Sequence, residues 1–342
     1  MKSNIKLIFF TLVFLGTPLF SYAGNQLING AGATFPEPIY NKWFLEFKKI
    51  NPETSINYQG IGSGGGIKQL INGTVDFAAT DLPMNADETK ALKNPVIHIP
   101  TIIGAVVVSH NLKIEKPLIL NGETVANIFS GKITKWNDEK IAKLNPGLKL
   151  PGTAIVVATR SDGSGTTAVF TDYLSKVSSD WKGKAAKTVD WLKGSVAAKG
   201  NAGVAGLIQQ GEGTIGYIEL VYALQNKISF AQIINKKGKA ITANSASVTA
   251  AASGQTSKEI IKNNLQLSIT DSESKEAYPI SSMTWLLIPE TLPKDKGDAI
   301  VKMLNWSMSK TGQDMATQLN YAALPKEIND EVIKKIKSIK IK

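Results

Sequence analysis

Short apolar runs alternate with segments of helical periodicity along most of this chain. Apolar residues recur at helical spacing at Ile39, Trp43, Phe47 and Ile50, which predicts one buried face of a helix. Strands are expected at 55–58, 75–79, 99–109, 155–158, 214–218 and 282–288, and helices at 67–71, 125–129, 141–144, 294–309, 312–319 and 326–339. This alternation predicts an α/β fold with a largely parallel sheet.

Three further segments are predicted from composition. Residues 200–203 (Gly-Asn-Ala-Gly) indicate a loop before a helix that ends at Gln210. Residues 236–262 are rich in Ala, Ser, Thr and Lys, which is typical of a surface hairpin and one helix. The apolar face of the last helix is expected to pack on the body of the protein rather than on a membrane.

At three places an apolar strand ends in glycine and hydroxyl residues, and a helix follows. These turns lie at 27–35, 58–66 and 160–167. A helix start exposes unpaired backbone N–H groups and the positive end of the helix dipole, so each turn can hold an anion. Three such turns, together with Arg160 and Asp81 at strand ends, predict a site that surrounds a small oxyanion.

Arg160 stands at the end of a predicted strand, two residues before Asp162. A guanidinium group there can donate two parallel bonds to an oxyanion while the neighbouring carboxylate fixes its orientation. Ser164, Gly165 and Thr166 add hydroxyls and backbone N–H groups, and a Cβ at Gly165 would obstruct a close anion. The alternative is a purely structural pair of Arg160 with Asp162 that holds the turn.

Asp81 indicates which oxyanion the site accepts. A carboxylate in such a site repels sulfate, which has no proton near neutral pH, whereas phosphate keeps a P–OH that can donate a charge-assisted bond. Ser63 adds a hydroxyl donor at the second turn. Two alternatives stay open: Ser63 caps its own helix, and Asp81 caps a helix over 85–90.

The first residues of the chain predict an export signal. Lysines precede an apolar run at 7–20, and residues 21–23 (Ser-Tyr-Ala) place small residues where a signal peptidase reads. Cleavage is expected after Ala23, so 1–23 is assigned as signal peptide. A membrane anchor is the weaker interpretation, because a span needs roughly 20 apolar residues and Gly16 and Pro18 interrupt this run.

Composition narrows the chemistry. The chain has 342 residues, enough for about two domains, and no Cys, so disulfides, thiolate sites and a lipid-modified cysteine are all ruled out. We therefore expect a periplasmic protein that is not a lipoprotein. His98 and His110, the only histidines, each stand beside an apolar strand and are expected to be packed, so we expect no metal site.

Two other classes of ligand fit the sequence poorly. Gly60-x-Gly62-x-x-Gly65 matches the dinucleotide pattern, with Asp81 about 20 residues further on, but the predicted helix is too short for that unit. We expect no cofactor. The net charge of +11 is spread along helices as a solvated surface, so no nucleic-acid partner is expected.

Several longer motifs resemble those of the periplasmic phosphate-binding proteins of phosphate ABC transporters. They span essentially the whole mature chain: 30–36 (Gly-Ala-Gly-Ala-Thr-Phe-Pro), 58–65, 76–81, 131–138, 144–147, 160–166, 216–217 and 321–325. The resemblance implies a type II periplasmic-binding-protein fold, in which each of two α/β lobes has a mixed, mainly parallel sheet flanked by helices and ligand binds in the inter-lobe cleft. It also implies that lobe one covers 24–103 and 280–342, and lobe two 104–279.

By the same resemblance, nine residues form the site. The implied phosphate ligands are Thr34, Phe35 (through its backbone N–H), Ser63, Asp81, Arg160, Ser164, Gly165 and Thr166, with Asp162 orienting Arg160. The family often has Ser where this chain has Gly64 and Thr80, so these two positions are left out of the site.

The implied function is high-affinity binding of inorganic phosphate in the periplasm and its delivery to the permease. The expected partners are the transmembrane permease subunits and their ATPase, and the free protein is expected to be a monomer and not an enzyme. Two rival classes are an exported phosphatase and an adhesive surface protein. The phosphatase lacks a placed general base for Ser63 or Ser164, and the adhesin rests only on the lysine-rich exterior.

Overall fold

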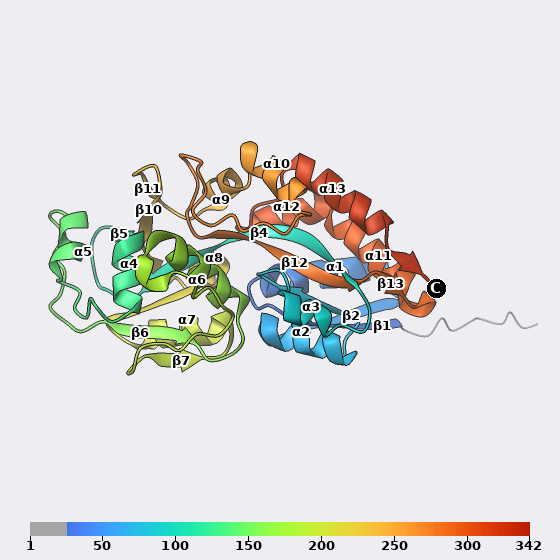
Figure 1. Cartoon of the computed structure of the whole chain (residues 1–342), viewed down its shortest axis with the longest axis horizontal. Helices are drawn as coiled ribbons and strands as arrows, with labels where there is room; N and C mark the ends of the chain where they lie inside the picture. The colour runs from blue at the N-terminus through green and yellow to red at the C-terminus, as the bar shows by residue number, and fades with distance from the viewer. Residues whose placement is uncertain (1–25) are drawn as a thin grey trace, which may run out of the picture.

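A computed structural model describes residues 26–342, so the predicted signal peptide lies outside the described residues. One curled sheet of nine strands runs through the whole molecule (Figure 1). Across the sheet the strands are β2 (Thr54–Gly60), β1 (Gln26–Gly32), β3 (Phe77–Thr80), β12 (Ser281–Pro289), β4 (Val96–His110), β8 (Thr214–Glu219), β6 (Val156–Arg160) and β7 (Val196–Ala198), with β9 (Ser229–Phe230) beside β4. The smaller strands are β5 (Ile119–Asn121), β10 (Gln232–Ile234) and β11 (Ala240–Ile241) in one sheet, and β13 (Thr291–Leu292) and β14 (Lys340–Ile341) in another.

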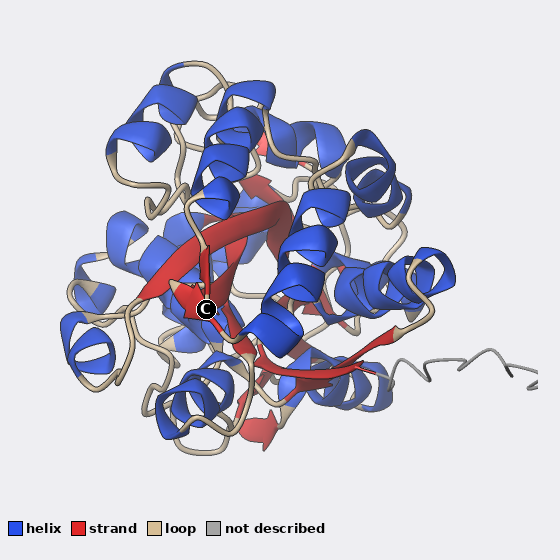
Figure 2. Cartoon of the chain, turned by 90° about the vertical axis from the view of Figure 1, so that its right-hand side faces the viewer, coloured by secondary structure: helices blue, strands red, loops and turns tan. Residues whose placement is uncertain are grey.

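Helices surround the curved sheet (Figure 2). In the N-terminal part they are α1 (Glu37–Ile50), α2 (Ser63–Asn72), α3 (Ala86–Lys90), α4 (Gly122–Phe129), α5 (Glu139–Leu144) and α6 (Gly165–Val177). The later helices are α7 (Gly200–Gln210), α8 (Leu220–Gln225), α9 (Ser245–Ala251), α10 (Gln255–Lys262), α11 (Lys294–Ser307), α12 (Lys310–Gln318) and α13 (Lys326–Lys337), with a 3-10 turn, η1 (Ser179–Trp181), after α6.

Strand β4 joins the two halves of the molecule. Up to Ala105 it pairs antiparallel with β12, and from Val106 it pairs antiparallel with β8 (Figure 1). The chain returns at Ile280, whose carbonyl accepts a 2.8 Å hydrogen bond from the Val106 N–H. Parallel pairs β2–β1–β3 and β8–β6–β7 complete the halves, so each has a mixed, mainly parallel sheet. The predicted two-lobed α/β fold is confirmed; the exact lobe bounds stay a prediction.

Most predicted elements form, with four corrections. Ile50 is 60% exposed because it is the last residue of α1 and lies beyond the packed face. Helix α2 begins at Ser63, four residues before the predicted start, and 200–203 forms the first turn of α7 rather than a loop. Segment 236–262 carries two helices, α9 and α10, where one was predicted.

The early start of α2 has a packing cause. A Cβ on Gly66 would lie 2.4 Å from the Cα of Gly32 in β1, so only glycine lets the helix approach the strand this closely. The same glycines that predict a loop from propensity therefore permit a tightly packed helix.

The remaining predictions about packing are confirmed. Ile328, Val332 and Ile336 of α13 are buried against the body, and His98 and His110 are buried. Within residues 26–342, no helix combines the length and apolar character that a bilayer crossing requires.

Candidate functional site

The three predicted turns converge between the two halves of the molecule. The Gly62 N–H donates to Gly32 O (2.9 Å), joining the first two turns, and the Gly64 N–H donates to Gly163 O (2.8 Å), joining the second to the third. All eight predicted ligand residues are buried: Thr34, Phe35, Ser63, Asp81, Arg160, Ser164, Gly165 and Thr166. The structure therefore brings together residues that lie more than 130 positions apart in the sequence.

The two halves of the molecule approach each other closely at Gly165. A Cβ built on this residue would lie 2.3 Å from Ser63 Oγ and 2.4 Å from Asp81 Oδ2, both of which belong to the opposite half. Glycine at this helix start thus leaves the space in which its N–H and the facing polar groups can surround one small ligand.

Asp81 follows β3 directly and carries an oxygen without a partner. Its Oδ1 accepts a 2.8 Å hydrogen bond from the Thr284 hydroxyl, whereas Oδ2 is buried and has no partner among the described residues. Burial raises the pKa of Asp81 to about 7, although the Thr284 bond and the charge of Arg160 oppose this rise. Helix α3 is capped by Asn85, so the alternative that Asp81 caps it is wrong.

Two of the three guanidinium nitrogens of Arg160 are hydrogen-bonded, and the third has no partner among residues 26–342. Its Nε and Nη2 donate to the two oxygens of Asp162 at 2.8 and 2.5 Å, while Nη1 is buried without a partner in the described part of the chain. Burial alone would raise the pKa of Asp162, but the bonds from Arg160 and from the Gly200 N–H (3.1 Å) bring it below its ordinary value. The pair therefore holds the turn and still leaves one cationic donor for a ligand.

Backbone and side-chain N–H groups donate to all four hydroxyl oxygens of the site. Ser63 Oγ accepts from the Asp81 N–H (3.3 Å), and Ser164 Oγ accepts from the Thr167 N–H (3.0 Å) as the N-cap of α6. Helix α2 is capped by Gly62, so the alternative that Ser63 caps it is wrong. Because these oxygens are engaged as acceptors, the hydroxyl hydrogens remain to donate to a ligand.

The threonines of the site follow the same rule. Thr34 Oγ1 accepts from the Asn201 N–H (3.2 Å) and from Asn201 Nδ2 (2.8 Å), and Thr166 Oγ1 accepts from the same Nδ2 (3.1 Å). Together with the free N–H groups at the start of α6, the site offers many donors and an unpartnered acceptor in Asp81 Oδ2.

Sequence reasoning missed the side chains that hold this site from behind. Tyr222 OH donates to Thr34 O (2.6 Å) and Tyr321 OH donates to Phe35 O (2.7 Å), while Thr284 and Asn201 make the bonds given above. These residues come from α8, the segment after α12, β12 and α7. Two of them had a signal in the sequence, since Tyr321 opens the motif at 321–325 and Asn201 lies in a glycine-rich stretch, but neither signal indicated a role at the site.

The arrangement suits a small anion more than any other ligand. Buried donors stabilise a tetrahedral oxyanion, and the unpartnered Oδ2 of Asp81, when ionised, favours an anion that carries a hydrogen. Among the residues that the structure describes, no three His, Cys, Asp or Glu side chains gather as a metal site would require.

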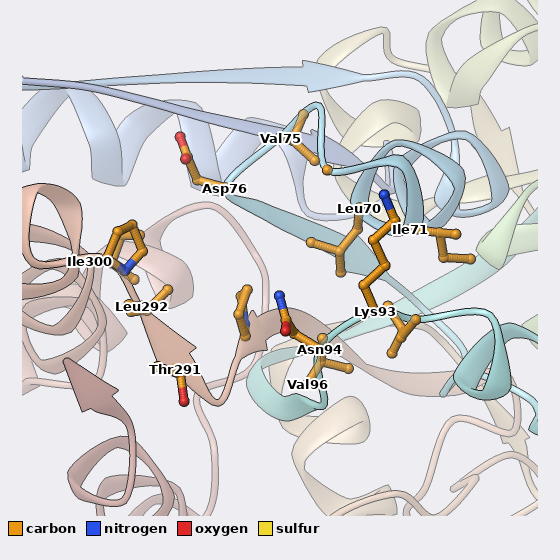
Figure 3. A pocket seen from close by; sticks show the side chains of 14 residues that line it. Leu70, Ile71, Val75, Asp76, Lys93, Asn94, Val96, Thr291, Leu292 and Ile300 are labelled. Carbon is orange, nitrogen blue, oxygen red and sulfur yellow. The ribbon is translucent and has the colours of Figure 1, made fainter. Parts of the chain in front are cut away.

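A second hollow lies away from this site, in the first half of the molecule (Figure 3). It has a volume of about 210 Å³, and its lining is mostly apolar, with Leu70 and Ile300 on opposite sides. Its acidic residue, Asp76, is already occupied by Lys296 (2.8 Å) and by the N–H of Asn29 (2.8 Å). The acidic residue of this groove is therefore already paired, unlike Asp81 of the anion site.

Comparisons with known proteins agree with this fold. A family model described as a PBP superfamily domain matches residues 21–311. The phosphate-binding protein PstS of Haemophilus influenzae is 40% identical over 324 residues, covering 92% of this chain and 93% of that protein. PstS of Pasteurella multocida is also 40% identical, over 90% of this chain and 89% of that protein.

Solved structures show the same fold. A high-affinity periplasmic phosphate-binding protein, PfluDING, bound with phosphate, superposes with a TM-score of 0.74 at 21% identity, covering 89% of this chain and 92% of that one. A putative phosphate ABC transporter substrate-binding protein with bound phosphate, from Clostridium perfringens, gives a TM-score of 0.63 at 19% identity, covering 87% and 100%.

Proposed function

This chain belongs to the family of the PstS phosphate-binding proteins, within the PBP superfamily, and from that membership we propose that it binds inorganic phosphate between its lobes and delivers it for import. The relatives are named as binding proteins, and the proposal includes no catalytic step.

One observation carries the choice of ligand. Asp81 Oδ2 and Arg160 Nη1 are both buried and unpartnered among residues 26–342, within a ring of donors. Phosphate supplies what both need, since its ionised oxygens accept from the guanidinium and its P–OH donates to the carboxylate. Sulfate satisfies only Arg160, and it leaves an ionised Asp81 facing another negative charge.

We assign the roles as follows. Arg160, oriented by Asp162, and the hydroxyls of Thr34, Ser63, Ser164 and Thr166 donate to phosphate oxygens. The backbone N–H groups of Phe35 and Gly165 donate as well, and Asp81 accepts the P–OH. Burial of every member of this set favours tight binding, because no water competes for the bonds.

The proposed setting is the periplasm, reached through a signal peptide that is cleaved after Ala23. There the protein would act as a monomer, close its lobes at 103–104 and 279–280 around phosphate, and meet the permease subunits of an ABC transporter. Support comes from the family membership and from the sequence of the first residues.

Titration calorimetry with phosphate, sulfate and arsenate tests the proposal. We expect one phosphate per chain, no sulfate heat at the same concentrations, and loss of phosphate binding in Arg160→Ala. As a matched control, Lys113→Ala removes an exposed cation whose partner is Glu212, and it should bind phosphate as the parent does. Equal heats for sulfate and phosphate in the parent would overturn the choice of ligand.

A further inference from the structure

Asn201 is fully buried at the start of α7, and its side chain has one orientation. Its Oδ1 accepts a 2.9 Å hydrogen bond from the backbone N–H of Glu219. Because a backbone N–H can only donate, the amide oxygen must face Glu219 and the NH2 group must face the threonines. The two hydrogens of that NH2 group are then used once each, on Thr34 Oγ1 and on Thr166 Oγ1.

We propose that Asn201 is a positioning residue that makes the hydroxyls of Thr34 and Thr166 donors toward the bound anion. The proposal rests on the proposed function and adds a residue to it. A hydroxyl whose oxygen already accepts a hydrogen bond keeps its own hydrogen for another partner. Thr34 Oγ1 accepts twice, from Nδ2 and from the backbone N–H of Asn201, so its hydrogen has only the ligand to serve.

The bond to Thr34 also connects the two halves of the molecule. Thr34 lies between β1 and α1 in one half, whereas Asn201 and Thr166 belong to the other. The Asn201–Thr34 bonds therefore form only when the halves meet. Closure thus engages the Thr34 oxygen as an acceptor and directs its hydroxyl hydrogen toward the ligand. Through Asn201, closing of the two halves makes the threonine hydroxyls donors, and donors favour a ligand that has several acceptor oxygens.

Asn201→Asp is the sharpest test because the two side chains have the same shape. A carboxylate at this position would keep its bond from the Glu219 N–H but would draw both threonine hydrogens toward itself. It would also place a negative charge near the anion. We expect Asn201→Asp to weaken phosphate binding about 100-fold or more at about pH 8, and Asn201→Ala about tenfold.

The pH profile separates this role from a structural one. Protonation removes the charge of the introduced carboxyl. The loss of phosphate affinity in Asn201→Asp should therefore shrink toward the loss in Asn201→Ala as the pH falls to about 5. The charged or titratable groups around this position are Asp81, Asp162, Arg160, Glu219, Glu37 and the buried Tyr217, Tyr222 and Tyr321. Burial raises the pKa of each tyrosine, so these three stay neutral over the pH range of the test. Each affinity is therefore expressed as a ratio to the parent at the same pH, which removes their own titration.

Asn145→Asp provides the matched control. Asn145 is also a buried amide that bridges two elements, accepting from Ile119 N and donating to Ile119 O and Ile141 O at 2.8 to 2.9 Å. It directly follows α5, which lies at the outer end of its half of the molecule (Figure 1). We expect this variant to melt earlier and to bind phosphate as the parent does. Such a result would show that a buried Asn→Asp change alone does not weaken binding.

A double-substitution series keeps the proposal testable if Asn201→Asp fails to fold. Because Asn201 acts through the threonines, Asn201→Ala should cost far less affinity when Thr34→Ala and Thr166→Ala are already present. Full additivity, a pH-independent deficit, or unchanged phosphate affinity in both Asn201 variants would overturn the inference. Failure of the parent itself to bind phosphate would overturn the proposed function instead, whereas a binding parent with normal Asn201 variants sinks the inference alone.

Discussion

Replacing Asp81 with Asn changes the one acceptor of the site into a donor while keeping its shape. The Asn oxygen can still accept the bond that Thr284 donates to Oδ1, at 2.8 Å in the parent. The new NH2 group would then occupy the place of the unpartnered Oδ2. A P–OH meets a donor there instead of an acceptor, whereas an anion without a hydrogen meets a donor instead of a negative charge.

The size of the effect follows from these two changes. Loss of a charge-assisted hydrogen bond costs about 1.5 to 3 kcal/mol, so phosphate should bind Asp81→Asn roughly 10- to 100-fold more weakly. For sulfate, the parent must first protonate Asp81, whose pKa is about 7, and the cost of that step grows tenfold per pH unit above this value. At about pH 9 the substitution should therefore strengthen sulfate binding by up to about 100-fold, and the gain should shrink toward pH 7.

Calorimetric titration of both anions checks this expectation. Asp76→Asn is the matched control, because Asp76 makes its bonds to Lys296 and Asn29 beside the separate groove of Figure 3. That variant should keep the phosphate affinity of the parent and its exclusion of sulfate. If Asp81→Asn retained full phosphate affinity and still rejected sulfate, recognition of the ligand hydrogen by Asp81 would be refuted.

Three other perturbations have definite expected outcomes. Gly165→Ala places a Cβ 2.3 Å from Ser63 Oγ of the opposite half, so the halves can no longer meet as closely. Phosphate binding should weaken about tenfold or more, which calorimetry checks. Glu88→Gln removes the charge that pairs with Lys187 across the halves (2.8 Å), and phosphate affinity measured in low salt should fall by roughly three- to fivefold, with a smaller loss in high salt. Because the pKa of Asp81 is raised from 3.8 to about 7, the anion-free native state holds a proton that the unfolded state lacks between these values, and stability should fall as pH rises through this window. Melting curves of the parent and of Asp81→Asn from about pH 4 to about pH 8 should show a steeper fall in the parent, because Glu37 and Glu219, whose pKa values burial also raises, contribute to both proteins alike.

Helix starts show where local prediction reached its limit. Glycine lowers helix propensity, so Gly64 to Gly66 and Gly200 to Gly203 predict loops when each segment is considered alone. In the structure both stretches are the first turns of helices. Glycine is needed in these turns for close packing: a Cβ on Gly66 would strike the backbone of β1, and one on Gly203 would lie 2.9 Å from the Cβ of Ala198. Close packing between distant segments outweighed the local preference.

The supporting residues of the site show the same limit more strongly. Thr34, Ser63, Asp81 and Arg160 each stand at the end of an apolar strand, in a local pattern that indicates anion chemistry without reference to the rest of the chain. Asn201 has no such pattern, because its role depends on partners from the turn between β1 and α1, from α6 and from β8.

The sequence by itself determined the α/β class, the three glycine-bearing turns and the charged residues that face one another across the cleft. Strand periodicity, helix-start chemistry and charge are properties of short segments, so each can be predicted from the residues of one segment alone. Only the tertiary structure decided which hydroxyl oxygens are engaged, which oxygen of Asp81 and which nitrogen of Arg160 remain without a partner, and how near the halves approach. Those properties depend on atoms brought together from segments far apart along the chain, to within a few tenths of an ångström, and no local pattern specifies distances on that scale.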